Sequence, residues 1–143
     1  MMKQCGYSAR FVLIAIVFGI LAMSGCDSDA VTVVDDKRLD RNLSSIIQGG
    51  GSVHLNAFIA GDWDEIRIYA KDAWSREGLQ REIGQDLDMP DYYMEKGSII
   101  LMVRDGRVVH GISIDTYLTP GAYRGGVVVR LDENTKELQV GEQ

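Results

Sequence analysis

The sequence predicts an α+β fold: a single small domain in which about six strands form one antiparallel sheet and two helices pack on it. Two stretches, residues 36–48 and a shorter one that ends near Ile83, carry apolar residues at helical spacing. β-rich runs fill much of the remaining chain, and Asp105-Gly106 separates two of them, which is a strong signal for a β-hairpin. The predicted order is helix, two strands, helix and four strands, with both helices on one face of the sheet.

The first helix is predicted over residues 36–48. Its apolar residues share one helical face: Leu39, Leu43, Ile46 and Ile47. Asp35 or Asp36 can cap the helix start, because an Asp side chain accepts hydrogen bonds from the unpaired N–H groups of the first turn. Three glycines at 49–51 then end the helix, since glycine adopts the left-handed conformation that is common just after a helix.

Two strands are expected next, over residues 52–59 and 63–70, because apolar and polar residues alternate in both. The turn residues Ala60-Gly61-Asp62 lead to the prediction that the two strands pair as a hairpin. In the second strand the predicted inward-facing residues are Ile66, Ile68 and Ala70, and the outward-facing ones are Glu65, Arg67 and Tyr69.

A second, shorter helix is predicted to end near Ile83, with Asp72 or Ser75 as its cap. Its apolar side is formed by Trp74, Leu79 and Ile83. Gly78 lowers the stability of this helix by about 1 kcal/mol relative to Ala, so the helix depends on tertiary contacts. Residues 86–97 are expected to follow as a loop.

The clearest hairpin spans residues 98–114, with a two-residue turn at Asp105-Gly106. The predicted register places Val103 opposite Val108 and Leu101 opposite His110. Both faces of this hairpin are apolar near its middle, so we expect it to be central in the sheet and covered on both sides. The last two strands are expected at residues 126–131 and 136–140, joined by a turn.

The N-terminal region has the organisation of a secretory signal. Lys3 and Arg10 give it a positive charge, and no acidic residue occurs before Asp27. Residues 11–22 form an uninterrupted apolar run of 12 residues, within the range of about 7–15 residues for the apolar part of a signal peptide. A bilayer-spanning helix needs about 20 apolar residues, so the run is short for a permanent anchor.

Ser24, Gly25 and Cys26 follow this run, and the arrangement resembles the cleavage site of bacterial lipoprotein signals. In that family the Cys becomes the first residue of the mature chain and carries lipid; Met23 stands where the family usually has Leu. The resemblance implies a signal peptide at 1–25. Residues 26–35 are acidic and lack a Pro or Gly turn signal, so they are expected to form a lipidated tether, with a short edge strand at Val31, Val33 and Val34 as the alternative. An α+β globular domain is expected at 36–143. The alternatives to a lipoprotein signal are an uncleaved signal anchor and ordinary secretion after cleavage at another small residue.

The same resemblance implies a location. Lipid on Cys26 would hold the protein to a membrane without a spanning helix, because two or more acyl chains give stable anchoring. Asp27 resembles the residue that, in the enterobacterial pattern, retains a lipoprotein in the inner membrane. The periplasmic face of the inner membrane is therefore favoured within the cell envelope, and the outer membrane is the alternative.

The mature chain is acidic and has no thiol left for a disulfide. Removal of residues 1–25 leaves 118 residues, enough for one domain with a hydrophobic core. These carry 13 basic and 21 acidic residues, a formal charge of −8, which argues against nucleic acid as a partner because Lys and Arg dominate phosphate binding. Cys5 leaves with the signal and Cys26 is taken by lipid.

No residue pattern points to catalysis, a metal ion or a cofactor. His54 and His110 each lie in a predicted strand without a second His or Cys at ligand spacing, so half-buried structural roles are expected. Acidic residues cluster at Asp62, Asp64 and Glu65 and at Asp86, Asp88 and Asp91. The second cluster lacks the central Gly and closing Glu of a calcium loop, and a glycosidase pair would require a defined carboxylate separation.

Aromatic residues suggest a contact surface instead, because Tyr and Trp are favoured where one end of a side chain is dry and the other wet. The predicted partner contacts are Tyr92, Tyr93, Tyr117, Trp63 and Asp64. For Trp63 and Trp74 a place in the core is favoured over a contact, and a hydrogen bond to backbone at the strand entry is the alternative for Asp64.

The stretch from Trp63 to Tyr69, WDEIRIY, resembles a motif of small uncharacterised bacterial lipoproteins. In those proteins a Trp-Asp pair opens a strand, and a helix and then a hairpin follow. The resemblance covers residues 61–114, and the chain departs from it at Ala70-Lys71, which stand in place of a turn. It implies no activity.

These observations lead us to expect a lipid-anchored envelope protein that acts as a non-catalytic binding or assembly module and contacts another envelope protein. An inhibitor of a lysozyme or protease is one alternative, since an acidic surface attracts a basic enzyme. An envelope hydrolase that uses paired carboxylates is a further alternative.

Overall fold

The structure, a computed structural model, describes residues 29–143. The predicted signal peptide and Cys26 lie outside these residues. Within them the chain forms nine strands in two sheets, three α-helices and the short 3-10 turn η1 (Lys71–Ala73), so the predicted α+β class is confirmed. No helix in this part of the chain is long and apolar enough to cross a bilayer.

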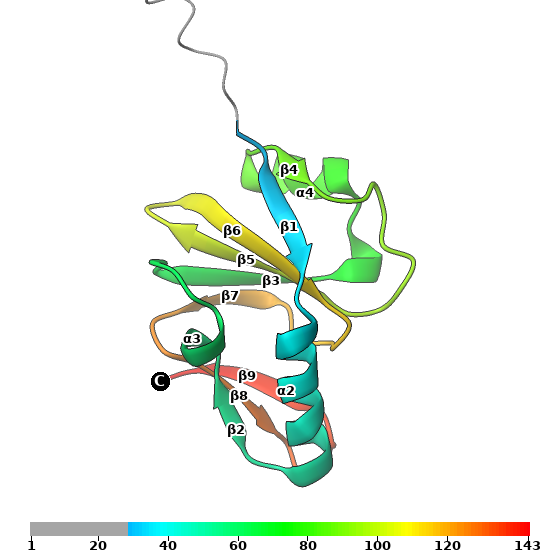
Figure 1. Ribbon diagram of the computed structural model, residues 1–143, viewed down its shortest axis with the longest axis vertical. Helices are drawn as coiled ribbons and strands as arrows, with labels where there is room; N and C mark the ends of the chain where they lie inside the picture. The colour runs from blue at the N-terminus through cyan, green and yellow to red at the C-terminus, as the bar shows by residue number, and fades with distance from the viewer. Residues whose placement is uncertain (1–28) are drawn as a thin grey trace, which may run out of the picture.

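The larger sheet has six strands in the order β4-β1-β6-β5-β3-β7 (Figure 1). In chain order these are β1 (Val31–Asp35), β3 (Glu65–Ala70), β4 (Leu87–Asp88), β5 (Ser98–Arg104), β6 (Arg107–Ile114) and β7 (Gly121–Arg124). β1 runs parallel to β4 and β6, and the other pairs are antiparallel. The sheet is therefore mixed rather than antiparallel as predicted.

β1 lies inside the segment predicted as a tether. It joins the sheet between β4 and β6, with the Val31 N–H donating to the Asp86 carbonyl at 3.0 Å. Val33 is buried, and Gly111 on β6 allows its close approach, because a Cβ at 111 would lie 3.1 Å from the Val33 side chain. The tether prediction is wrong for Val31–Asp35, since a short valine-rich run becomes a strand when neighbours on both sides supply hydrogen bonds.

The smaller sheet has three strands in the order β2-β8-β9. They are β2 (Ser52–His54), β8 (Val127–Leu131) and β9 (Leu138–Glu142). β2 pairs with β8, so the predicted hairpin between residues 52–59 and 63–70 is wrong. The second half of the first predicted strand is the helix α3 (Leu55–Phe58), because that turn buries both Leu55 and Ile59 in the core. The predicted C-terminal hairpin is confirmed as β8-β9.

The two predicted helices are present with the expected caps. α2 (Lys37–Gly49) begins after Asp36, whose side chain accepts from the N–H groups of residues 38 and 39 at 3.0 and 2.9 Å. α4 (Arg76–Ile83) begins after Ser75, whose hydroxyl accepts from the Gly78 N–H at 3.0 Å. Both helices end at a glycine with positive φ.

The helices cover opposite faces of the larger sheet, not one face as predicted. Leu39 and Leu43 of α2 share a core cluster with Ile100 and Met102 of β5. Leu79 of α4 belongs to a second cluster, formed with the alternate residues of β5. Alternate residues of a strand point to opposite faces, so β5 is central and covered on both sides, as the sequence predicts. Figure 1 shows α4 above the sheet, and α2 with the smaller sheet below it.

The β5-β6 hairpin turns at Asp105-Gly106, where both residues have positive φ, 49° and 76°, as a tight primed turn requires. The pairing of Val103 with Val108 is as predicted. A bulge between Met102 and Val103 then shifts the register by one residue. Met102 therefore lies opposite His110, and the predicted pairing of Leu101 with His110 is wrong.

Candidate functional site

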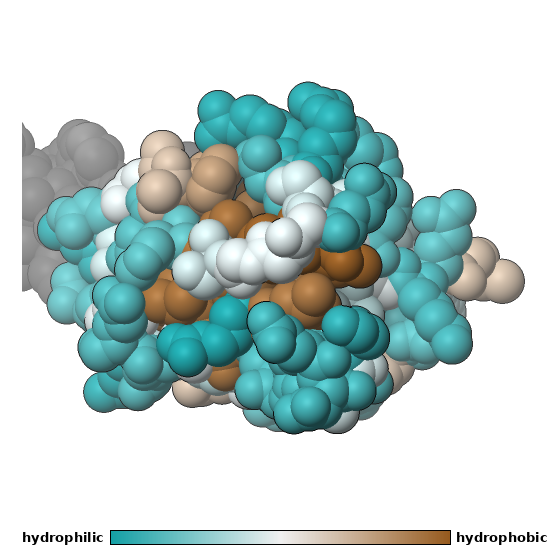
Figure 2. Space-filling model, turned by 90° about the horizontal axis from the view of Figure 1, so that it is seen from below, coloured by the Kyte–Doolittle hydropathy of each residue, from teal (hydrophilic) through white to brown (hydrophobic). Residues whose placement is uncertain are grey.

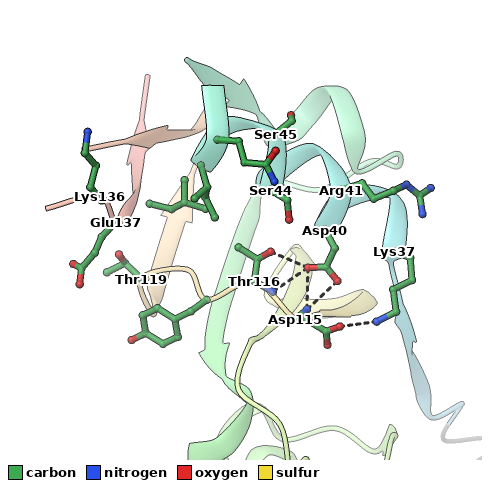
Figure 3. Close-up of a pocket in the computed structure, with 14 residues that line it drawn as sticks. Lys37, Asp40, Arg41, Ser44, Ser45, Asp115, Thr116, Thr119, Lys136 and Glu137 are labelled. Carbon is green, nitrogen blue, oxygen red and sulfur yellow. Dashed lines mark hydrogen bonds and ion pairs between the residues drawn. The ribbon is translucent and has the colours of Figure 1, made fainter. Parts of the chain in front are cut away.

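An open groove of about 950 Å³ runs between α2 and two loops, residues 115–119 and 136–138 (Figure 3). The first loop links β6 to β7, and the second runs into β9, whose first residue is Leu138. The groove is therefore built from segments that are distant in the sequence and belong to both sheets. It contains one of the predicted contact residues, Tyr117.

Asp40, in the first turn of α2, fixes the loop on one side of the groove. Its carboxylate accepts the N–H groups of Asp115 and Thr116 and the Thr116 hydroxyl, all at 2.9 Å. Two further contacts hold the loop: the Leu118 N–H donates to the Ser98 hydroxyl at 2.8 Å, and Leu118 is fully buried. Hydrogen bonds on both sides of Tyr117 therefore hold the backbone of this residue in place.

Two lysines meet at the Asp115 carboxylate. Lys37 donates to it at 2.7 Å and Lys71 at 2.9 Å. Lys71 is unusual in that only 4% of its side chain is exposed, and its ammonium also lies 5.1 Å from the centre of the Tyr93 ring. The hydrogen bond from Lys37, and after it the one from Lys71, lowers the pKa of Asp115 to about 2. The same pair raises the pKa of Lys37 above its usual value.

Asp35, Asp40 and Asp115 bring one carboxylate oxygen each within 4.8 Å of the others, a spacing that a metal ion could bridge. The ammonium of Lys37 already binds two of these groups, Asp35 at 3.2 Å and Asp115 at 2.7 Å. The Asp40 carboxylate is occupied by three donors from the loop. A cation would have to displace these partners, so the cluster is explained by its own ion pairs.

The ion pairs predict how stability depends on pH. The pKa of Asp115 is lower in the folded chain than the value of about 3.9 in an unfolded chain. The ionised carboxylate therefore stabilises the fold at pH values above this unfolded-chain pKa. This contribution is lost as the pH falls from 4 towards 2. We expect Asp115→Asn to be less stable than the wild type at pH 7 and to lose less stability over this acid range.

Urea unfolding at a series of pH values measures this difference. Asp72→Asn is the matched control, because Asp72 is exposed and makes no ion pair within residues 29–143. Equal acid sensitivity of Asp115→Asn and the wild type would contradict a stabilising role for this carboxylate.

The rim of the groove exposes apolar and cationic side chains. Tyr117 is 56% exposed and Ile47, on α2, is 47% exposed. Arg41 on α2 and Lys136 on the opposite loop line the groove, and neither forms an ion pair with another residue of the described chain. Figure 2, which views the end with α2 and the smaller sheet, shows hydrophobic surface ringed by hydrophilic residues.

The other predicted contact residues do not join Tyr117. Tyr92 is exposed beside α4, at a separate pocket. Tyr93 packs against the second core cluster and over Lys71. Trp63 packs on the first core cluster, and its ring N–H lies 3.5 Å from the Ile59 carbonyl, so the core alternative describes it best. The prediction of one contact surface from these residues is not supported by their placement.

The predicted acidic clusters serve the fold. Asp64 accepts the Asp105 N–H at 3.2 Å and so holds the hairpin turn, which agrees with its backbone-bonding alternative. Glu65 was expected to face outward but is buried, since hydrogen bonds from Arg67 and Arg124 hold its carboxylate; that from Arg67 contributes most to lowering its pKa. In the second cluster Asp91 forms an ion pair with Arg76.

The remaining predicted positions are structural or exposed. Thr32 donates its hydroxyl to Asp88 at 3.3 Å. His54 and His110 are both exposed rather than half buried. Trp74 packs edge-on against Tyr69, with ring centres 5.4 Å apart, and both pack against the second core cluster.

Three residues in or beside the groove have no signal in the sequence. Asp40 and Thr116 are 76 residues apart, and no local pattern connects them. Lys71 is the first residue of the turn η1, and nothing in its local sequence marks it for burial. Its burial depends on Asp115, 44 residues further along the chain.

Comparison with protein-family models, with curated proteins and with solved structures finds no match to this chain. The groove, its fixed loop and its exposed side chains are therefore the observations from which a function can be argued. None of the groove residues forms a known catalytic motif in the described part of the chain.

Proposed function

We propose that this chain is a lipid-anchored binding module of the bacterial cell envelope, and that the groove between α2 and the loops at 115–119 and 136–138 receives a second envelope protein. The anchor is supported by the Ser24-Gly25-Cys26 sequence after a short apolar run. Asp27 favours the inner membrane as its location, with the outer membrane as the alternative.

The observation that carries the binding proposal is an exposed Tyr117 on a loop whose backbone is pinned. Interface hot spots are enriched in Tyr, and a preorganised loop loses little entropy when a partner binds. Ile47 supplies an apolar neighbour on the other wall of the groove. Arg41 and Lys136 add cations that are not already paired within the described chain, so the partner segment is expected to present apolar and acidic side chains.

Two carboxylates of the groove, Asp40 and Asp115, favour binding over hydrolysis. A glycosidase needs one carboxyl group with a raised pKa to act as a general acid near neutral pH. Asp115 has the opposite shift, because two lysines stabilise its ionised form. Asp40 is taken up by the loop.

Site-specific photo-crosslinking in the producing bacterium tests the groove. A photoreactive amino acid at Tyr117 is expected to give a discrete adduct with one envelope protein. Ile47→Asp should reduce this adduct about tenfold or more, because losing a hot spot costs about 2 kcal/mol or more. The full-length chain is used in both cases, and circular dichroism confirms that Ile47→Asp remains folded.

The matched control carries the photoreactive group at Val109, which is also about half exposed but does not line the groove. The same adducts at both positions, or an adduct that persists in Ile47→Asp, would count against the groove as the binding site. If the partner is a lysozyme or protease and the domain slows that enzyme, the inhibitor alternative is the correct form of the proposal.

The anchor has its own test. Intact-mass analysis of the chain extracted from cells is expected to show a species that begins at Cys26 and carries acyl chains. Cys26→Ser should move the protein from the membrane fraction to the soluble fraction of the envelope. A chain that still begins at Met1, or one with an unmodified Cys26, would contradict lipid anchoring.

A further inference from the structure

The distance between the proposed lipid and the folded domain is short. β1 begins at Val31, five residues after Cys26, and Val31 is held by the Asp86 carbonyl. A fully extended chain gains at most about 3.6 Å per residue, so Val31 would lie within about 18 Å of a lipidated Cys26. The start of β1 therefore has to stay close to the bilayer surface.

The elements at this end of the molecule are α4 and the first part of the loop that joins β4 to β5; the later part of the loop returns to Lys71, whose N–H donates to the Gly97 carbonyl. Asp29 lines a shallow pocket together with Glu77 and Gln80 of α4. The same two α4 residues line a neighbouring pocket with Tyr92 of the loop. Figure 1 shows the chain entering the fold at the end where β4 and α4 lie, while α2 runs from β1 towards the other end.

This loop exposes two side chains, at positions 92 and 94, that are suited to a bilayer interface. Met94 is 93% exposed and Tyr92 is 69% exposed. Tyr is enriched at the level of the lipid headgroups, where its ring is buried and its hydroxyl stays hydrated. Tyr93, between them, turns inward onto the core and over Lys71.

The base of the loop is tied to α4. Arg76 and Asp91 form an ion pair, and the Arg76 N–H donates to the Asp91 carbonyl at 2.9 Å. The loop therefore presents Tyr92 and Met94 outward from a fixed base, so little order has to be gained when they meet a surface.

We infer that Tyr92 and Met94 insert into the headgroup region of the same bilayer that carries the Cys26 lipid, and that the domain stands on this membrane with the far end of α2 and the smaller sheet turned away from it. This inference rests on the proposed lipid anchor. The tether supplies a high effective concentration of the loop at the bilayer, so two side chains suffice where they would be too weak for an untethered domain.

Charge does not drive this contact. Residues 76–97 carry three basic and six acidic residues, so this region is net negative and does not attract acidic headgroups. An interaction with acidic headgroups would weaken in salt, because salt screens exposed charges. Insertion of Tyr92 and Met94 is apolar, so it should persist at high ionic strength.

A depth measurement on the full chain tests the inference. Cys5 and Cys26 are the only cysteines in the sequence, so a lipidated chain with Met94→Cys has one thiol for an environment-sensitive fluorophore. Tyr117→Cys, on an exposed loop at the groove, is the matched control. Each labelled protein is reconstituted into vesicles of phosphatidylethanolamine and phosphatidylglycerol that contain nitroxide-labelled lipid.

The label at 94 is expected to be quenched several-fold more strongly than the label at 117, with no loss of quenching at high salt. A flexible insertion of a dozen residues before Ala30 should reduce the difference. Equal quenching at both positions in a chain whose mass shows lipid on Cys26 would overturn the orientation and leave the anchor intact. A mass that shows a free Cys26 thiol would remove the anchor and the orientation with it.

Discussion

Gly97→Ala is expected to destabilise the domain by about 3 kcal/mol or more. Gly97 has a φ of +144°, which residues with a side chain rarely adopt, and a Cβ there would lie 2.2 Å from the carbonyl oxygen of Ile114. That oxygen is backbone at the end of β6 and has no rotamer by which to move away. The carbonyl of Gly97 also accepts the Lys71 N–H at 3.0 Å, so a shift of residue 97 disturbs the end of β3.

Denaturant unfolding followed by far-UV circular dichroism measures this loss, and Gly84→Ala is its control. Gly84 also has positive φ, +70°, but no atom lies within 4 Å of a Cβ at that position. Its substitution should cost only about 1 kcal/mol, the price of the left-handed conformation alone. Equal losses for the two variants would show that the close approach to Ile114 is not what fixes Gly97.

Ile100→Ala is expected to reduce the free energy of unfolding by about 2–5 kcal/mol. Ile100 is fully buried at the middle of β5, with Ile68 opposite it on β3 and Ile112 opposite it on β6. Domains of this size have a total stability of about 5–15 kcal/mol, so the variant would lose a large part of it. Urea unfolding with a two-state analysis gives the value.

Two companion variants sharpen this measurement. Val109→Ala, at a half-exposed position on β6, should change stability by no more than about 0.5 kcal/mol. Leu101→Ala should cost as much as Ile100→Ala, because Leu101 is fully buried on the opposite face of β5. A Leu101→Ala variant as stable as Val109→Ala would contradict the packing of α4 on that face.

Local signals in the sequence predict the elements whose stability is decided by neighbours along the chain. Asp36 and Ser75 cap helices because an oxygen side chain near the unpaired N–H groups acts within one turn. Asp105-Gly106 makes its hairpin because both residues tolerate positive φ. These features need no knowledge of the rest of the fold.

Strand partners are harder to predict, because pairing joins residues that are distant in sequence. Ser52–His54 looks like half of a hairpin with the next strand, yet it pairs with β8, more than 70 residues later. β1 looks like a polar tether until β4 and β6 take up its hydrogen bonds. The bulge after Met102 depends on how β5 and β6 fit their neighbours, and it moves the register by one residue.

In the candidate site, too, local features can be predicted from the sequence and long-range contacts cannot. Tyr117 stands out in the sequence as an aromatic residue in a loop, and it lies in the groove. Asp40, which fixes that loop, has no local signal, because its partners are Asp115 and Thr116. Tyr93 and Trp63 have the same chemical character as Tyr117, and only their burial separates them from it.

The sequence by itself determined the α+β class, the two capped helices and the central hairpin, because each depends on composition, periodicity or a short motif. Only the tertiary structure decided which strands pair, which face of the sheet each helix covers, and which side chains surround the groove. The physical reason is that hydrogen-bond partners and burial depend on contacts between segments that are distant in the sequence. Lys71, for example, is buried where its ammonium donates to the Asp115 carboxylate and lies over the Tyr93 ring.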